Sequence, residues 1–148
     1  MTLVSTLSIV ANADQELHDQ RLEIGIATSP VYFLNEDEFA LGLHVHGMYL
    51  IQDTNLSIGL GYERIFDDHR HQTIGVVVGS NIWRGLTLNV NVGATFDENA
   101  ISESEFALHL ESTYEFSIDW FHFGPVVEWA YDPNDQHISL GLHTALHF

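Results

Sequence analysis

Residues 86–96 read LTLNVNVGATF, and residues 105–116 read EFALHLESTYEF. In both segments large apolar residues occupy every second position, and small or polar residues occupy the positions between them. A period of two residues is the pattern of a β-strand whose two faces meet different surroundings. These segments therefore predict two strands with one apolar face and one polar face.

The same alternation recurs along the chain from Arg21 onward. It predicts strands over residues 21–28, 39–51, 56–66, 71–81, 86–96, 105–116, 120–131 and 136–148. Most are close to the ~9–11 residues that a tilted strand needs to cross a bilayer. No stretch approaches the ~18 uncharged apolar residues of a membrane-spanning helix, so any membrane span has to be built from strands. Pro125 falls inside the seventh predicted strand, where we expect a local bulge at Gly124-Pro125.

The apolar face is the bulkier of the two, which predicts that it forms the exterior. A soluble ligand-binding barrel has the opposite arrangement, with bulky apolar groups inside. An apolar exterior requires lipid, and a closed barrel is the sheet that satisfies its backbone there. We therefore predict an all-β fold, a closed up-and-down antiparallel transmembrane β-barrel of about eight strands. An acidic soluble barrel remains an alternative.

The connections and the aromatic residues favour the same topology. Short turns at residues 53–55, 83–85 and 117–119 alternate with longer, acidic connections at residues 29–38, 67–70, 97–104 and 132–135. Short turns are typical of the periplasmic side, which places both termini there. The apolar face also carries aromatic residues near both ends of the strands, as expected for rings at the two interfaces of a bilayer. The outer set is Phe39, Tyr62, Phe96, Phe106, Trp129 and Tyr131, and the inner set is Tyr49, Trp83, Tyr114, Phe116, Phe121 and Phe148.

Charge and composition restrict the partners. The 148 residues include 21 acidic residues, four arginines and no lysine, for a net charge of −17, which disfavours nucleic acid and favours cations. There is no cysteine, so disulfides and thiol chemistry are excluded. Near the start, the apolar residues 3–10 precede Ala11-Asn12-Ala13, a small-x-small cleavage pattern. We interpret residues 1–13 as a remnant or truncated signal peptide and residues 14–148 as a single barrel domain.

The alternating segments, the loop lengths and the final strand HISLGLHTALHF resemble the small eight-stranded outer-membrane proteins of the OmpA and OmpX types. The resemblance covers residues 21–148 and is one of pattern. It implies the cell outer membrane as location, outer-membrane lipid and lipopolysaccharide as surroundings, and a monomer. It also implies recognition by the barrel assembly machinery through a terminal aromatic signal, which Leu140, Leu142, Leu146 and Phe148 match. The chain departs from these families in the interior, where histidine rather than arginine or lysine accompanies the acids.

Strand parity predicts an interior wall rich in histidine and glutamate. The residues expected inside are Arg21, Glu23, His44, His46, Glu63, Glu105, His109, Glu111, Glu115, His122, Glu128, His137, His143 and His147. One interpretation is a plugged interior held together by histidine–glutamate pairs. The other is a cation or transition-metal site, because imidazole and carboxylate suit such ions. Its candidate ligands are His44, His46, His109, Glu111, His122, Glu128 and His143.

An enzyme is a third interpretation, since some small outer-membrane barrels modify lipid A. Ser139 with His137 and His143 is the nearest candidate for a nucleophile and its base, but it lacks a recognisable motif. The acidic loops at residues 35–38 and 67–69 could bind calcium or bridge lipopolysaccharide through divalent ions, although solvated loops explain them as well. We predict a non-enzymatic outer-membrane barrel with a narrow, largely plugged interior and a structural or surface-interaction role, without a required cofactor. A barrel that binds or conducts small cations is the alternative.

Overall fold

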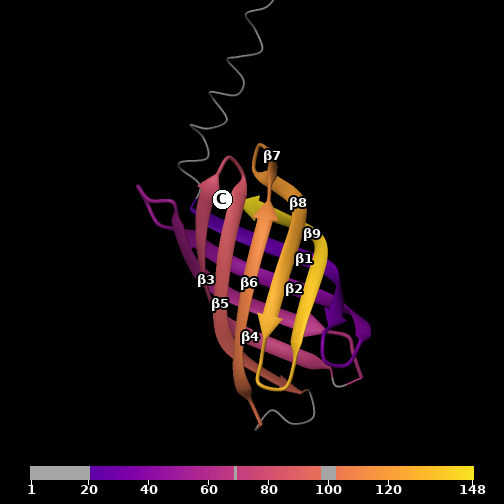
Figure 1. Cartoon of the computed structure of the whole chain (residues 1–148). Helices are drawn as coiled ribbons and strands as arrows, with labels where there is room; N and C mark the ends of the chain where they lie inside the picture. The colour runs from indigo at the N-terminus through magenta and orange to yellow at the C-terminus, as the bar shows by residue number, and fades with distance from the viewer. Residues whose placement is uncertain (1–20, 69, 98–102) are drawn as a thin grey trace, which may run out of the picture.

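The computed structural model describes residues 21–68, 70–97 and 103–148. The strands are β1 (Leu22–Phe33), β2 (Glu38–Leu50), β3 (Leu56–Ile65), β4 (His71–Trp83), β5 (Leu86–Asp97), β6 (Glu105–Tyr114), β7 (Phe116–Ile118), β8 (Phe121–Tyr131) and β9 (Gln136–His147). Neighbours pair antiparallel in the order β6-β5-β4-β3-β2-β1-β9-β8-β7, and β6 also pairs with β8, which closes the sheet (Figure 1). The short β7 continues β6, since both pair with β8 in one register. The fold is therefore a closed antiparallel barrel of eight strands, as predicted.

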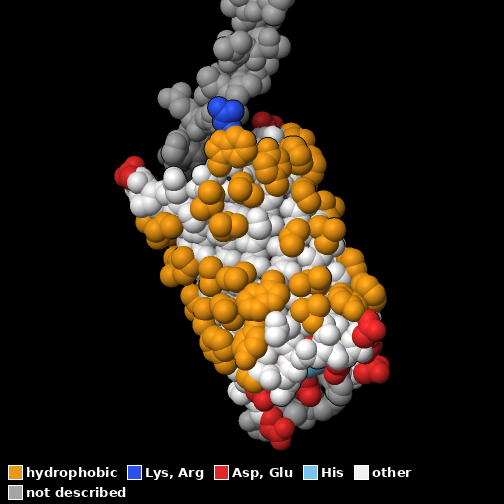
Figure 2. Space-filling view, in the orientation of Figure 1, with side chains coloured by type: hydrophobic (Ala, Val, Ile, Leu, Met, Phe, Trp, Pro, Cys, Tyr) orange, Lys and Arg blue, Asp and Glu red, His pale blue; other side chains and the backbone are white. Residues whose placement is uncertain are grey.

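Side chains alternate between the exterior and the interior along every long strand. On the exterior, Leu60 and Leu140 are 63% and 62% exposed, whereas the interior residues Val77 and Asn91 are 2% and 3% exposed. Figure 2 shows hydrophobic side chains over the wall of the barrel, with most of the visible acidic side chains at its lower end. The apolar face is thus the exterior, which is the arrangement of a barrel that meets lipid. Among the described residues, no helix has the length and apolar character to cross a bilayer.

The two ends of the barrel differ. One end, here called the turn end, carries the C-terminus and the connections at residues 51–55, 84–85 and 119–120. The opposite end, here called the loop end, carries the connections at residues 34–37 and 132–135 and the described parts of two others, at residues 66–68, 70 and 103–104. The predicted signal segment 1–13 lies outside the described residues, as do His69 and residues 98–102 of the third loop.

The first connection is shorter than predicted. The sequence predicted a loop over residues 29–38, but β1 continues through Ser29-Pro30 to Phe33. Pro30 keeps its place opposite Leu41 of β2, while the ladder to β9 lapses at these two residues and resumes in the same register at Val31. A proline has no N–H to donate, so β1 is paired here with β2 only.

Pro125, like Pro30, lies in a strand that keeps its pairing on one side and loses it on the other. The bulge predicted at Gly124-Pro125 is absent. β8 runs unbroken against β9, with Pro125 opposite Leu142. The interruption falls on the other side, where the ladder to β8 lapses at Tyr114 and Glu115 between β6 and β7 without a change of register. Gly124 permits the close approach there, because a Cβ added to it would overlap the Tyr114 carbonyl.

Replacing Gly85 by Ala is expected to lower the free energy of unfolding by about 1–3 kcal/mol. Gly85 has a φ of 85°, and a Cβ there would overlap the carbonyl oxygen of Glu115. Gly47→Ala is the matched control, because a Cβ at that position meets no atom within 4 Å. Chemical unfolding in detergent micelles measures both, and equal stability of the two variants would contradict the strain at Gly85.

Candidate functional site

Histidine and glutamate side chains from six strands meet inside the barrel. They are His44, His46, His109, His122, His137, His143, His147, Glu23, Glu63, Glu111, Glu115 and Glu128. The histidines are at most 8% exposed, and Glu63, Glu111 and Glu128 are between 3% and 5% exposed. Most inward positions of β4 and β5, by contrast, carry small or uncharged side chains such as Val77 and Asn91, and His71 and Asp97 stand only at their loop-end limits.

The loop-end group consists of His44, Glu63, His109, Glu111, Glu128 and His137. His44 Nδ1 lies 3.2 Å from Glu111 Oε2. Nδ1 of His109 lies 3.4 Å from Glu128 Oε2 and 3.5 Å from Glu63 Oε2. Nε2 of His137 lies 3.9 Å from an oxygen of each of these two glutamates. Glu63, Glu128 and His137 each offer a ligand atom within 4.8 Å of the other two, and His109 lies beside the two glutamates.

The turn-end group consists of Glu23, His46, Glu115, His122, His143 and His147. Glu23 faces His46 Nε2 and His147 Nε2, each at 2.9 Å. Glu115 lies 3.4 Å from His122 Nδ1 and 3.6 Å from His143 Nδ1. The rings stack in pairs, His122 on His147 and His46 on His143, with centroids 3.9 Å and 5.1 Å apart. This group is more tightly paired than the loop-end group.

Glycines on the inward face make room for these side chains. A Cβ added to Gly25 would overlap His46 Nε2 and would lie 2.6 Å from His143 Nε2. A Cβ added to Gly61 would lie 3.1 Å from His44 Nε2 and 3.3 Å from Asn91 Nδ2. The long polar side chains thus reach across the interior and fill the space that the glycines leave.

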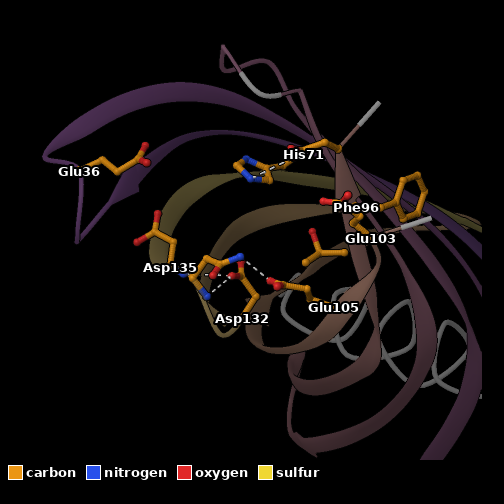
Figure 3. A pocket seen from close by; sticks show the side chains of 10 residues that line it. Glu36, His71, Phe96, Glu103, Glu105, Asp132 and Asp135 are labelled. Atoms are coloured by element: carbon orange, nitrogen blue, oxygen red, sulfur yellow. Dashed lines mark hydrogen bonds and ion pairs between the residues drawn. The ribbon is translucent and has the colours of Figure 1, made fainter. Parts of the chain in front are cut away.

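A cavity lies at each end of the barrel interior. The loop-end cavity holds about 270 Å³ and is lined by Glu36, His71, Thr95, Phe96, Asp97, Glu103, Glu105, Asp132, Asn134 and Asp135. Its acidic side chains surround the mouth of the barrel (Figure 3). The turn-end cavity holds about 460 Å³ and includes Glu23, Glu115, His122 and His147 in its lining. Below the loop-end cavity, a space of only about 10 Å³ is lined by residues that include His71, His109 and His137.

The predicted metal ligands do not form a single cluster. His44, His109, Glu111 and Glu128 lie in the loop-end group, whereas His46, His122 and His143 lie in the turn-end group. Parity also placed Glu63 and His137 inside, but they were missing from the predicted ligand set. The cross-strand register is the signal that links Glu63 to this set, since it faces His44 across β2 and β3.

The structure also places the candidate nucleophile Ser139 and the residues of the predicted assembly signal. Ser139 is 7% exposed and faces Glu128 across β8 and β9. Within the described residues, its hydroxyl makes no hydrogen bond to His137 or His143. Leu140 and Leu142 are exposed on the barrel exterior, Leu146 is half-buried and Phe148 is 57% exposed at the turn end.

No protein-family model matches the sequence, and no curated protein matches it. Solved structures do match its fold. A de novo designed transmembrane β-barrel superposes with a TM-score of 0.59 at 13% identity, covering 86% of this chain and 96% of the other. Neisserial surface protein A matches with a TM-score of 0.56 at 9% identity, covering 86% and 96%. The attachment invasion locus protein Ail of Yersinia pestis matches with a TM-score of 0.54 at 12% identity, covering 87% and 97%.

The fold and its apolar exterior define a transmembrane β-barrel. More narrowly, the chain has the eight-stranded architecture of the small outer-membrane barrels, which neisserial surface protein A and Ail also have. The resemblance drawn from the sequence is confirmed at the level of the fold.

Proposed function

We propose that the protein is an integral barrel of the cell outer membrane with an interior closed to solutes, and that it has a structural or surface-contact role. The observation that carries the proposal is the filled interior. Histidine and glutamate side chains occupy it between the two end cavities, and the space below the loop-end cavity is about 10 Å³. An eight-stranded barrel has an interior just wide enough for side chains.

The surroundings of the barrel follow from its surface. Outer-membrane lipid and lipopolysaccharide would contact the apolar exterior, and the assembly machinery would read Phe148 with the exposed leucines of β9. The loop-end acids, including Asp67 and Asp132, favour contact through divalent cations that bridge to lipopolysaccharide phosphates. The barrel acts as a monomer in this proposal.

We expect vesicles that contain the purified barrel to retain small solutes as well as empty vesicles do. The reason is that a solute would have to displace buried, paired side chains such as His44 with Glu111. Vesicle swelling in sugars and current across planar bilayers measure the permeability. A wide porin reconstituted at the same protein-to-lipid ratio is the positive control. Sugar entry above the empty-vesicle rate would overturn the closed interior.

A cation conduit is the second candidate function, and the continuous set of ionisable side chains between the two end cavities favours it. Its test uses the same bilayers. If the barrel carries a cation current, the double variant Glu111→Gln, Glu128→Gln should reduce that current, because both carboxylates lie inside the loop-end group. A current that falls in this variant would favour the conduit over the closed barrel.

A further inference from the structure

Contacts between histidine and glutamate inside the barrel differ in length. At the turn end, the Glu23 carboxylate meets His46 Nε2 at 2.9 Å in a hydrogen bond, whereas Glu115 lies 3.4 Å from His122 and 3.6 Å from His143. At the loop end, the contacts of His109 and His137 with Glu63 and Glu128 measure 3.4–3.9 Å. Charge-assisted hydrogen bonds are about 2.7–2.9 Å long, so the loop-end contacts are too wide for that interaction.

Several polar atoms inside the barrel are buried without hydrogen-bond partners, including ring nitrogens of His122, His143 and His147 at the turn end. At the loop end, Glu63 Oε2, His109 Nδ1 and His137 Nε2 have no such partner, and their residues are 3%, 3% and 5% exposed. Buried polar atoms are normally paired, and a group of unpaired ones calls for an explanation such as an ion. Two of these residues, Glu63 and His137, form with Glu128 a group whose ligand atoms lie within 4.8 Å of one another, and a metal ion would satisfy such a group.

The spacing fits a tetrahedral metal site. With zinc bonds of about 2.0–2.1 Å, neighbouring tetrahedral ligands are about 3.3–3.5 Å apart. His137 Nε2, at 3.9 Å from an oxygen of each glutamate, needs to move by a few tenths of an ångström. Glu63, Glu128 and His137 each offer one ligand atom within 4.8 Å of the other two. His109 Nδ1 lies 3.5 Å from Glu63 Oε2 and 3.4 Å from Glu128 Oε2, beside this group and not part of it.

Charge and position favour a divalent cation. Glu63 and Glu128 are two buried carboxylates, and the chain has no lysine to neutralise them. A divalent ion with one neutral imidazole would balance both charges, which avoids the cost of burying unpaired charge. The acidic loop-end cavity in Figure 3 attracts cations, and the small space beneath it is lined by His109 and His137. The cluster therefore lies next to the loop-end cavity.

We propose that Glu63, Glu128 and His137 hold one divalent transition-metal ion, with Zn²⁺ and Co²⁺ as the fitting ions and a water molecule as the fourth ligand of a tetrahedral site. The protein ligands come from β3, β8 and β9, so the bound ion links three strands across the barrel. His44 is held by Glu111, which in turn accepts a hydrogen bond from Asn89 at 2.8 Å. This arrangement keeps His44 on Glu111 and leaves Glu128 to the metal. The site goes beyond the proposed closure of the interior and does not depend on it.

The test uses the full chain without an affinity tag, folded in detergent micelles and stripped with EDTA. Titration with CoCl₂ is expected to give one equivalent of Co²⁺ with the strong visible absorption of a tetrahedral complex, which ZnCl₂ then displaces. Calorimetry with ZnCl₂ gives the Kd. A wild-type barrel that shows only the weak absorption of octahedral Co²⁺, or no saturable binding, would overturn the site.

Two ligand variants and one control locate the ion. Glu63→Gln and His137→Asn should each raise the Kd for Zn²⁺ at least 100-fold, above the ~10–100-fold seen when outer-shell partners are lost. Glu115→Gln, the same change in the turn-end group, should leave the Kd within about threefold. Heat-modified gel mobility shows that each variant is folded. If Glu63→Gln does not fold, His137→Asn decides, and the wild-type Co²⁺ spectrum decides on its own if neither folds.

The outcomes also separate this proposal from the closed interior. Loss of binding in Glu115→Gln with retention in Glu63→Gln would place the ion in the turn-end group and overturn the assignment. Solute entry into vesicles, by contrast, tests only the closure.

Discussion

Replacing Leu60 by Arg is expected to lower the free energy of unfolding by about 2–4 kcal/mol when the barrel is embedded in phospholipid vesicles. Leu60 is 63% exposed in the middle of β3, between Gly47 of β2 and Val76 of β4. At this height an arginine has to reach from the hydrocarbon centre to the interface. Denaturant unfolding followed by tryptophan fluorescence measures the change.

Leu56→Arg is the matched control for this prediction. Leu56 lies at the turn-end start of the same strand, on the same face, and is 46% exposed. Near the interface the same substitution costs about 0–1 kcal/mol. If both variants lose equally little stability, as expected for surface positions of a soluble protein, the transmembrane placement is wrong.

Replacing Glu128 by Leu should cost about 3–5 kcal/mol, because it removes one partner from a buried group of ionisable side chains. Glu128 is 4% exposed and faces His44 at 3.9 Å, His109 at 3.4 Å and His137 at 3.9 Å. None of these histidines finds a replacement partner in a leucine. The measurement is denaturant unfolding in micelles with EDTA present, so that metal binding does not contribute.

The control is Glu105→Leu at the loop end, where the glutamate accepts a hydrogen bond from Asn134 in an exposed position. A change within about 0.5 kcal/mol is expected there. A Glu128→Leu barrel that unfolds at the wild-type denaturant concentration would show that the loop-end group does not stabilise the fold.

The fold could be predicted because alternate residues of a membrane barrel face lipid and the interior, and they differ in polarity accordingly. In β5, Leu88, Val90 and Val92 are 40–47% exposed while Asn91 is 3% exposed, as the alternation predicted. The predicted strand boundaries were wrong where the local sequence suggests a turn but the chain still pairs with a neighbouring strand. Ser29-Pro30 reads as the start of a loop, yet pairing with β2 alone keeps the strand extended.

The site was only partly predictable. Parity placed the histidines and glutamates inside, but it could not say which of them meet, because that depends on the stagger of strands around the barrel. His44 and Glu111 are 67 residues apart in the chain and still form a 3.2 Å contact. Proximity along one strand, which suggested a joint role for His44 and His46, does not reveal that they contact different glutamates.

The two partners of Glu23 mark different stages of assembly. His46 sits on the hairpin partner of β1, so this contact needs only a short loop to close, whereas His147 lies on the last strand. Contacts between distant parts of a chain form slowly, because the chain loses conformational entropy before these contacts stabilise it. Until β9 arrives, β1 and β8 present unpaired edges, which hydrocarbon does not tolerate. Arrival of the final strand therefore commits the chain to the bilayer, and Glu23 joins the first strand of the barrel to the last at that step.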